Sequence, residues 1–449
     1  MRLTRLAVIA LALSQGAYLL AWSPTERVDR KPSGYAALHP AIAVGPDGVP
    51  RAVWEERLLQ QALDKVMYAR REGDTWTIPL NVSRDSGDIR FPALAMDGLG
   101  RAVVVWSEEG RARIKYVRQM DDTWSLPKLC FPYTGITPRL VSDGRGRLHL
   151  LYEDLASHGG IWYSYFLPVP DSWTTPTRVA LGTGEVGWSS LAVDRFDHLH
   201  AVWMDWGTNG LDYALNDGTG WAAPTPLPDP APDAQSCEPA VAADSSGRPF
   251  VFWQERWSGY WLYHSRQDDT AWTTPVKFCD VQGDLPSACG GPLGEVHVLW
   301  NTVGLLHAAV SDSGWSAIET LDAASSFESA VTQSGGDLHA IWRRGGSLFY
   351  SRQALSGVRD DHAGLRAGGD WLRTLVGTSH LAVHLDEPET ADLLVLNAAG
   401  ARVSHVNLGL LAAGTHIVRL PTSDTAAGVY FCRVRAGCKV LTTKMARTR

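Results

Sequence analysis

Beyond its first 22 residues, this chain of 449 residues contains no run of 18 or more apolar residues. We therefore expect no membrane span in the mature chain, because a helix needs about 20 apolar residues to cross a bilayer. Positive charge is also scarce, since 41 Lys and Arg stand against 48 Asp and Glu, a net charge of −7. Nucleic acid is not expected as a partner, because its recognition depends on clustered basic side chains.

Cysteine is scarce as well, with six in the chain. The sequence has no CxxC motif and no Cys/His cluster, so we expect no metal site and no cofactor. Disulfides are allowed if the chain is exported. Cys279 and Cys289 flank one loop and are the candidate pair, and Cys432 with Cys438 is a further pairing across a hairpin.

Residues 1–21 are typical of a secretory signal peptide. They begin with two Arg, continue as an apolar run over 6–13, and end at Ala21, after which we expect cleavage, with Ala17 as the alternative site. A membrane anchor is the alternative, but the polar residues at 14–16 interrupt the apolar stretch that an anchor needs. We therefore expect export through the periplasm to a secreted or cell-surface location.

Seven repeats dominate the rest of the chain, with aligned starts 43 to 52 residues apart. Each opens on an entry segment such as HPAIAV (39–44), FPALAM (91–96) or EPAVAAD (238–244) and passes through a Gly/Asp turn. A second apolar strand then ends in an aromatic residue, which is Trp54, Trp106, Tyr152, Trp203, Trp253, Trp300 or Trp342. Four short strands per repeat predict a β-propeller blade, and these aromatic residues are expected to pack blade against blade.

Most fourth strands begin with Trp and carry Pro three residues later, as in Trp124 and Pro127. Proline cannot donate to a strand ladder, so the fourth strand is expected at the open outer edge. The seventh repeat has no such strand, but residues 22–28 resemble one. The sequence therefore predicts an all-β, seven-bladed β-propeller whose N-terminal strand closes the last blade.

The hairpins over 68–76 and 263–272 end in Asp-Thr-Trp and Asp-Thr-Ala-Trp. They resemble the Asp-box hairpin of sialidase-like (BNR-repeat) propellers, although the Ser and Gly spacing of that motif drifts here. The resemblance covers residues 22–355 and implies a propeller fold more than an activity.

Residues 374–449 differ in character and contain Asn397-Ala-Ala-Gly-Ala-Arg402, Leu411-Ala-Ala-Gly-Thr-His416 and Gly428-Val-Tyr-Phe431. This order is similar to that of the C-terminal sorting domain of the type IX secretion system, a small Ig-like β-sandwich. The resemblance implies the type IX secretion machinery as a partner, with residues 356–373 as the linker to the propeller.

One motif of the sequence is related to a catalytic site. Arg90-Phe91-Pro92 resembles the Arg-Ile-Pro motif of sialidases, whose Arg belongs to a carboxylate clamp, but the same Pro recurs in other entry segments. An ordinary surface Arg is the competing interpretation. A glycoside hydrolase of the sialidase superfamily is therefore the alternative function, with Arg90 as its one weak catalytic candidate.

Acidic residues recur two positions after the second-strand aromatic residue, where the loop should open on the ligand-binding face. They are Glu56, Glu108, Asp154, Asp205 and Glu255. They form either an acidic rim for a polar ligand or a set of caps and ion pairs that serve each repeat.

Several aromatic residues are not required by the repeats and fall on the same face in repeats four and five. They are Trp188, Trp206, Trp257 and Tyr260. Aromatic faces beside Asp205 and Glu255 would suit a sugar, whose C–H surface stacks on an indole while its hydroxyls bond to carboxylates. Loops that form a small core of their own are the competing interpretation. We expect a non-catalytic propeller that recognises a glycan or a surface protein, with a structural or adhesion protein as a second alternative.

Overall fold

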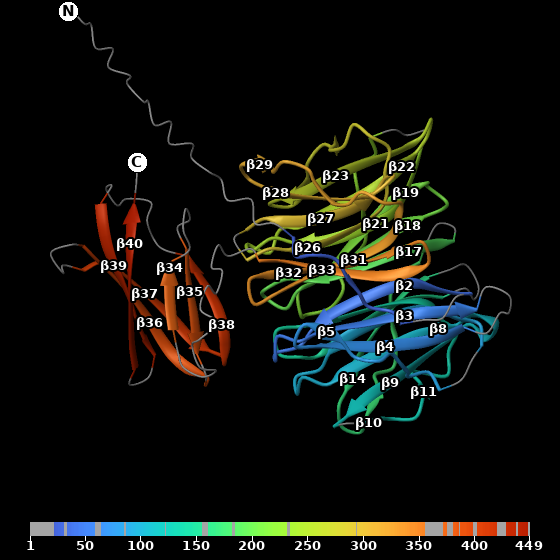
Figure 1. Cartoon of the computed structure of the whole chain (residues 1–449). Helices are drawn as coiled ribbons and strands as arrows, with labels where there is room; N and C mark the ends of the chain where they lie inside the picture. The colour runs from blue at the N-terminus through green and yellow to red at the C-terminus, as the bar shows by residue number, and fades with distance from the viewer. Residues whose placement is uncertain are drawn as a thin grey trace, which may run out of the picture.

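The computed structural model describes residues 22–30, 34–58, 64–84, 87–121, 123–154, 160–181, 185–230, 234–292, 294–354, 371–374, 380–385, 387–397, 402–419, 428–436 and 439–447. These residues form β-strands and one short 3-10 helix, η1 (Glu109–Arg111). The described part of the chain is therefore all-β, as the repeats predict. Seven antiparallel sheets of four or five strands, each with the strand pattern of a propeller blade, are followed by two further sheets (Figure 1).

The first three sheets each contain five strands, and their fourth strand is broken into two short pieces near its proline. The first sheet holds β2 (Tyr35–Val44), β3 (Pro50–Leu58), β4 (Asp64–Glu72), β5 (Thr75–Trp76) and β6 (Leu80–Asn81). The second holds β7 (Ile89–Met96), β8 (Ala102–Glu108), β9 (Arg113–Met120), β10 (Thr123–Trp124) and β11 (Lys128–Leu129). The third holds β12 (Ile136–Ser142), β13 (Leu148–Asp154), β14 (Gly160–Leu167), β15 (Ser172–Trp173) and β16 (Thr177–Leu181).

The fourth to sixth sheets repeat this order. The fourth holds β17 (Val186–Val193), β18 (Leu199–Asp205), β19 (Gly210–Asn216) and β20 (Thr225–Pro226). The fifth holds β21 (Gln235–Ala243), β22 (Pro249–Arg256), β23 (Tyr260–Asp268), β24 (Ala271–Trp272) and β25 (Val276–Lys277). The sixth holds β26 (Asp284–Gly290), β27 (Val296–Asn301), β28 (Leu305–Ser311), β29 (Gly314–Trp315) and β30 (Glu319–Asp322).

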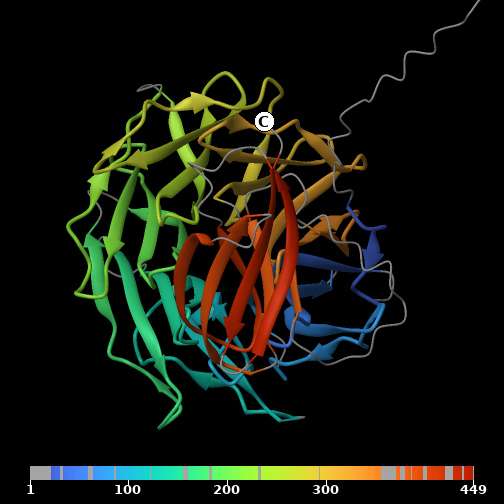
Figure 2. The same cartoon turned by 90° about the vertical axis from the view of Figure 1, so that its left-hand side faces the viewer.

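The seventh sheet joins the two ends of the repeat region. It holds β31 (Ser326–Ser334), β32 (Asp337–Arg344), β33 (Ser347–Ala354) and, at its outer edge, the N-terminal β1 (Glu26–Arg27). Glu26 pairs with Tyr350 and Arg27 with Phe349, so the pairing predicted for the N-terminal segment is present. The first strands of neighbouring sheets contact one another from β2 round to β31, which contacts β2 again. The sheets therefore surround a common axis (Figure 2).

The sheets pack on one another through the aromatic residues of the second strands. Trp54, Trp203, Trp300 and Trp342 are fully buried, and Trp106 is 1% exposed. Each apolar cluster draws residues from two neighbouring sheets. The packing role predicted for these indoles is confirmed.

The C-terminal strands form two antiparallel sheets that lie apart from the other seven (Figure 1). One holds β34 (Trp371–Thr374), β35 (His380–Leu385) and β38 (Gly414–Arg419). The other holds β37 (Arg402–Leu411), β36 (Glu389–Asn397), β39 (Gly428–Ala436) and β40 (Lys439–Arg447). Both sheets contribute to one apolar core, for example through Val383 of β35 and Val395 of β36.

The candidate disulfide is absent from the structure, because Cys279 and Cys289 are both free thiols. Cys279 packs between the fifth and sixth sheets, whereas Cys289 packs toward the seventh. The two side chains thus belong to different apolar clusters, although they are only ten positions apart in the sequence. Cys432 is also free, while Cys438, the signal segment 1–21 and most of the linker lie outside the described residues. Within the described ranges, no helix has the length and apolarity to cross a membrane.

Candidate functional site

A cavity of about 530 Å³ lies among the first strands of all seven sheets. Its lining residues come from β2, β7, β12, β17, β21, β26 and β31. Because these strands contact one another in a closed circle, the cavity follows the common axis, and we call it the axial cavity. Its volume lies in the range of about 300–1,000 Å³ that is usual for small-molecule sites.

Each of the seven first strands carries a β-bulge. At every bulge one residue other than glycine adopts a φ between 44° and 51°. These residues, called the bulge residues below, are His39, Phe91, Thr137, Trp188, Glu238, Leu285 and Glu328. Such a φ costs a non-glycine residue on the order of 1–3 kcal/mol, and a bulge re-aims the side chain that it carries. All except Thr137 line the axial cavity, so the strained backbone directs side chains at it.

The bulge residue is the variable position of an otherwise regular segment. His39 and Phe91 are each followed by Pro-Ala and two apolar residues, and small or apolar residues recur in the other repeats. The bulge position itself changes between acidic, aromatic, aliphatic and polar side chains. The fold thus fixes the backbone there but not the side chain. Apart from Trp188, none of these positions was expected from the sequence, although the changing first residue of the entry segments signals them.

His39 is held at the wall of the cavity by two carboxylates. Its Nδ1 lies 2.8 Å from Glu55 Oε2, and its backbone N–H donates to Glu328 Oε2 at 2.7 Å. Glu55 is fully buried and also accepts a hydrogen bond from Arg57 Nη2 at 2.6 Å. The ring of Phe91 lies 4.4 Å from the imidazole. The His39 side chain therefore has a fixed orientation.

Arg139 follows the bulge of β12 and also lines the axial cavity. Its Nε donates to the carbonyl of Ser189 at 2.6 Å. The carboxylate of Glu153 accepts hydrogen bonds from the backbone N–H and the hydroxyl of Ser189, at 3.0 and 2.9 Å. Burial raises the pKa of Glu153, and its contacts with Ser189 and Arg139 oppose that shift. This part of the wall presents a guanidinium backed by a buried acid.

Trp188 connects the cavity to the aromatic residues that were expected to bind a ligand. Its ring lies 4.8 Å from that of Trp206, and the guanidinium of Arg256 lies 5.0 Å from the Trp188 ring and 5.8 Å from that of Tyr260. Arg256 also donates to Glu238 Oε1 at 2.8 Å. Trp206 and Tyr260 are 39% and 49% exposed. They form an accessible aromatic surface. Arg256, which was not predicted from the sequence, contacts the rings of Trp188 and Tyr260 within it.

The acids expected to assist these rings are buried instead. Asp205 and Glu255 are 1% and 2% exposed. The carboxylate of Asp205 accepts the N–H of Gly207 at 2.8 Å, and that of Glu255 accepts bonds from Trp253 Nε1 at 2.5 Å and from the Ser236 hydroxyl. Residues two apart on a strand share one side, and the side of Trp253 is the interior. The structure therefore differs from the expectation that both acids face a ligand.

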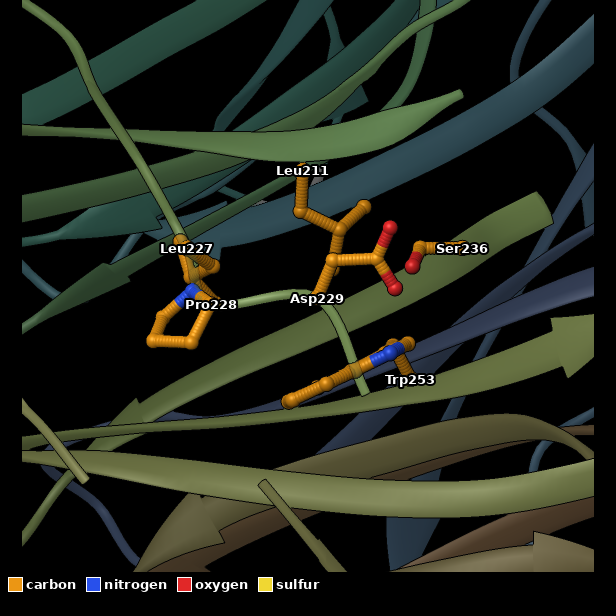
Figure 3. A pocket seen from close by; sticks show the side chains of 6 residues that line it. All are labelled: Leu211, Leu227, Pro228, Asp229, Ser236 and Trp253. Atoms are coloured by element: carbon orange, nitrogen blue, oxygen red, sulfur yellow. The ribbon is translucent and has the colours of Figure 1, made fainter. Parts of the chain in front are cut away.

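Trp253 and Ser236, which both bond Glu255, line a second cavity between the fourth and fifth sheets. It measures about 10 Å³, and Figure 3 shows its lining residues Leu211, Leu227, Pro228, Asp229, Ser236 and Trp253. The carboxylate of Asp229 points toward Ser236 (Figure 3). Burial raises the pKa of Glu255 to about 7, and the charge of Asp229 adds to that shift. The space is large enough for about one water molecule and too small for a sugar. Because Glu255 is buried and bonds Trp253 and Ser236, its contacts are those of a residue that supports the fold.

The other acids of the expected rim also have structural partners. Glu56 is 8% exposed and is engaged by neighbouring groups. Glu108 pairs with Lys115 at 3.3 Å, and Asp154 accepts a hydrogen bond from the Thr134 hydroxyl at 2.5 Å. These contacts favour caps and ion pairs over a rim for a ligand.

The remaining predicted residues lie apart from one another. Arg90 is surrounded by three carboxylates, those of Glu55, Asp88 and Glu109, at 3.4 to 3.7 Å. Its charge is therefore matched within the fold. Trp257 lies at the tip of the β22–β23 hairpin and is 69% exposed. Over the ranges that the structure covers, no group of three or more His, Cys, Asp or Glu is placed to hold a metal ion.

Comparison with known proteins identifies the fold but no family. No family model and no curated protein sequence matches the chain. Among solved structures, an ulvan lyase from a new polysaccharide lyase family is 11% identical with a TM-score of 0.54, over 73% of this chain and 95% of its own. The polysaccharide lyase Uly1 is 12% identical with a TM-score of 0.51, over 70% and 90%. A fungal alcohol oxidase in complex with copper is 11% identical with a TM-score of 0.51, over 95% and 99%. At these identities the similarity shows the fold alone.

Proposed function

We propose that this chain is an exported, seven-bladed β-propeller that recognises a glycan, with the axial cavity and the aromatic surface beside it as the binding site. The observation that carries the proposal is the set of bulge residues. Seven strained positions, six of which line one cavity, vary in side chain while the rest of each segment repeats. Backbone strain of this kind is retained where side chains must be aimed at a ligand. The two polysaccharide lyases among the structural neighbours add support for a saccharide ligand.

The chemistry of the wall suits a sugar. Phe91 and Trp188 offer aromatic faces for the C–H surface of a pyranose ring. Glu238 and Glu328 supply carboxylate oxygens that can accept hydrogen bonds from hydroxyls. A protein ligand, the alternative left open by the sequence, would instead use the exposed rings of Trp206, Tyr260 and Trp257 outside the cavity.

A glycan array followed by calorimetric titration of the best glycan tests the proposal. Replacing Trp188 by Ala should weaken binding by roughly 1–3 kcal/mol, the loss expected for a central aromatic contact. The matched control is Leu99→Ala, which removes a side chain that is 75% exposed on a distant turn. Absence of any glycan ligand, or equal losses in both variants, would count against the proposal.

We also propose that residues 1–21 direct export and that the C-terminal sheets are an Ig-like sorting domain read by the type IX secretion machinery. The shared core of the two sheets supports a sandwich that folds as a unit. A chain without residues 374–449 should then remain in the periplasm of the native host. Normal surface display of that truncated chain would contradict the sorting role.

A sialidase-type hydrolase is the alternative that requires free arginines in the site. Arg90 is paired with carboxylates, which weakens this alternative. Release of the fluorophore from a fluorogenic sialoside would favour it. A purely adhesive protein would bind host cells while ignoring every arrayed glycan.

A further inference from the structure

The axial cavity contains one side chain that is arranged as a general base. His39 Nδ1 faces the buried carboxylate of Glu55 at 2.8 Å, and Arg57 Nη2 donates a hydrogen bond to the same carboxylate. Nδ1 is therefore the nitrogen that carries the proton, as the hydrogen-bond network assigns it. Among the described residues Nε2 has no hydrogen-bond partner, and the ring lines the cavity. A neutral imidazole in this orientation accepts a proton at Nε2.

The guanidinium of Arg139 lines the same cavity, and its contacts within the fold leave hydrogen-bond donors available. Arg139 donates through Nε to the Ser189 carbonyl, while its two terminal nitrogens have no protein hydrogen-bond partner within the described ranges. A guanidinium with both terminal nitrogens available binds a carboxylate through two parallel hydrogen bonds. The wall can therefore hold an acidic sugar by its carboxylate.

His39, the base, and Arg139, the cation, lie on the first and third of three neighbouring strands that line the cavity. His39 belongs to β2, Phe91 to β7 and Arg139 to β12, and these strands are neighbours in the circle. The ring of Phe91, 4.4 Å from the imidazole, lies on the strand between them. A sugar ring stacked on Phe91 would thus have a base on one side and a carboxylate-binding group on the other.

We propose that His39 and Arg139 catalyse β-elimination on a uronate residue of a polysaccharide bound in the axial cavity. This activity rests on the proposed glycan recognition. Nε2 of His39 takes the proton from C5, the C5–H electron pair forms the C4–C5 double bond, and the C4–O bond breaks. The electron pair of that bond leaves with the oxygen of the departing sugar, which takes the proton back from the imidazolium. Arg139 stabilises the negative charge that builds on the carboxylate as C5 loses its proton.

Elimination fits this cavity better than hydrolysis does. Hydrolysis of a glycoside generally needs two carboxyl groups, one as acid and one as base or nucleophile. Each of the two glutamates of the cavity wall can still accept a hydrogen bond from a sugar hydroxyl but is tied through one oxygen, Glu238 Oε1 to Arg256 and Glu328 Oε2 to the His39 N–H. Elimination needs a single oriented base and a neutralised carboxylate, which are the two groups present. Glu55 acts as a positioning residue, because it orients the imidazole without reaching the cavity.

The experiment incubates the purified mature chain with ulvan, pectate and alginate and follows the ultraviolet absorbance of the unsaturated uronate. Wild-type protein should release this product from at least one of the three. His39→Asn should slow the reaction at least about 100-fold, the usual contribution of a general base, with affinity changed less than about threefold. Arg139→Gln should raise KM and lower kcat, and Glu55→Gln should shift the pH–rate profile. The control His198→Asn alters a histidine on a distant turn that pairs with Asp194 and should leave the rate unchanged.

The outcomes separate this activity from the proposed function. Tight binding of a uronate polysaccharide without any unsaturated product would overturn the elimination and leave glycan recognition intact, as would binding of neutral glycans only. Full activity of a folded His39→Asn variant would also overturn it. Absence of binding to any glycan would remove both proposals together. Thermal unfolding of each variant shows that a lost rate does not reflect a lost fold.

Discussion

The N-terminal segment should contribute measurably to the stability of the propeller. Val28 is fully buried in a cluster that joins the first and seventh sheets, and its N–H donates to the Leu348 carbonyl at 2.9 Å. Asp29 is 1% exposed and accepts the Leu348 N–H at 3.0 Å. At the other end of the segment, Ser23 donates its N–H to the Arg352 carbonyl at 2.7 Å. Removal of the segment therefore exposes apolar surface and leaves a buried N–H without an acceptor.

The expected loss follows from these contacts. Burial of a valine side chain contributes about 1.5–3 kcal/mol, and a buried donor left without its acceptor costs about 1–3 kcal/mol. A chain that begins at residue 31 should thus be about 2.5–6 kcal/mol less stable than one that begins at residue 22. At roughly 2 °C per kcal/mol for a domain of this size, the Tm should fall by about 5–12 °C.

Differential scanning calorimetry of the two chains measures this difference. Val28→Ala in the longer chain should lower Tm by a smaller amount, because it keeps the strand pairing of β1. Leu99→Ala, at an exposed turn, should leave Tm unchanged and serves as the control. Equal Tm values for the two chain lengths would refute the role of the segment in closing the circle of sheets.

Three further predictions concern packing, pH and the tail. Trp106→Ala should destabilise the fold by roughly 3–5 kcal/mol through the cavity that it leaves, whereas Trp257→Ala should change stability by less than about 0.5 kcal/mol. Equal urea midpoints for the two variants would contradict the packing role of Trp106. Burial lowers the pKa of His264 and of His339 to about 4, below the value of about 6.5 in an unfolded chain. Between about pH 6.5 and 4 the unfolded chain therefore binds more protons than the folded chain. The contribution of these two histidines to the free energy of unfolding should then fall as the pH is lowered through this window. In urea titrations, the double variant His264→Gln with His339→Gln should show a smaller loss of stability over the same pH range. Removal of residues 374–449 should leave the Tm of the propeller unchanged, and its collapse would contradict separate folding of the two parts.

The repeat pattern carried enough information to predict the packing of the sheets. The second-strand aromatic residues recur at a fixed place and are large and apolar, so burial is their expected state. The outer-edge position of residues 22–28 was predictable for the same reason, because the missing fourth strand of the last repeat had a match elsewhere in the chain. The burial of the aromatic residues and the place of the N-terminal segment both follow from residue types and their order along the chain, which can be read from the sequence.

The burial of Asp205 and Glu255 could have been predicted from the alternation of strand side chains. Strand side chains alternate between two sides, so an acid two positions after a buried Trp253 must share its side. Glu255 follows this rule and is buried, whereas Arg256, one position further on, reaches the aromatic surface. The contacts of Asp205, Glu255 and Glu108 with a turn, an indole and a lysine favour the alternative that each acid serves its own repeat.

The bulge residues could not be assigned to the cavity from alternation alone. A bulge adds one residue to a strand and reverses the side that every later residue faces. Whether His39 or its neighbour points at the axis therefore depends on where the bulge falls, and the sequence marks that place only by variation between repeats. Cys279 and Cys289 were misjudged similarly, because their packing into different clusters is a property of three-dimensional structure.

A final prediction tests whether the bulge positions are strained for the sake of their side chains. Phe91 has φ 51°, and alanine there should keep the strain, whereas glycine should relieve it. Phe91→Gly should therefore be more stable than Phe91→Ala by about 1 kcal/mol, the reverse of the usual strand order, in which glycine costs about 0.5–1 kcal/mol relative to alanine. Ala95→Gly, at a regular position of the same strand, should show the usual order by losing stability. Urea denaturation measures all three differences, and a less stable Phe91→Gly variant would contradict the strain. Because both Phe91 variants remove the same ring, they should lose glycan affinity equally, which would separate the cost of the backbone from the use of the side chain.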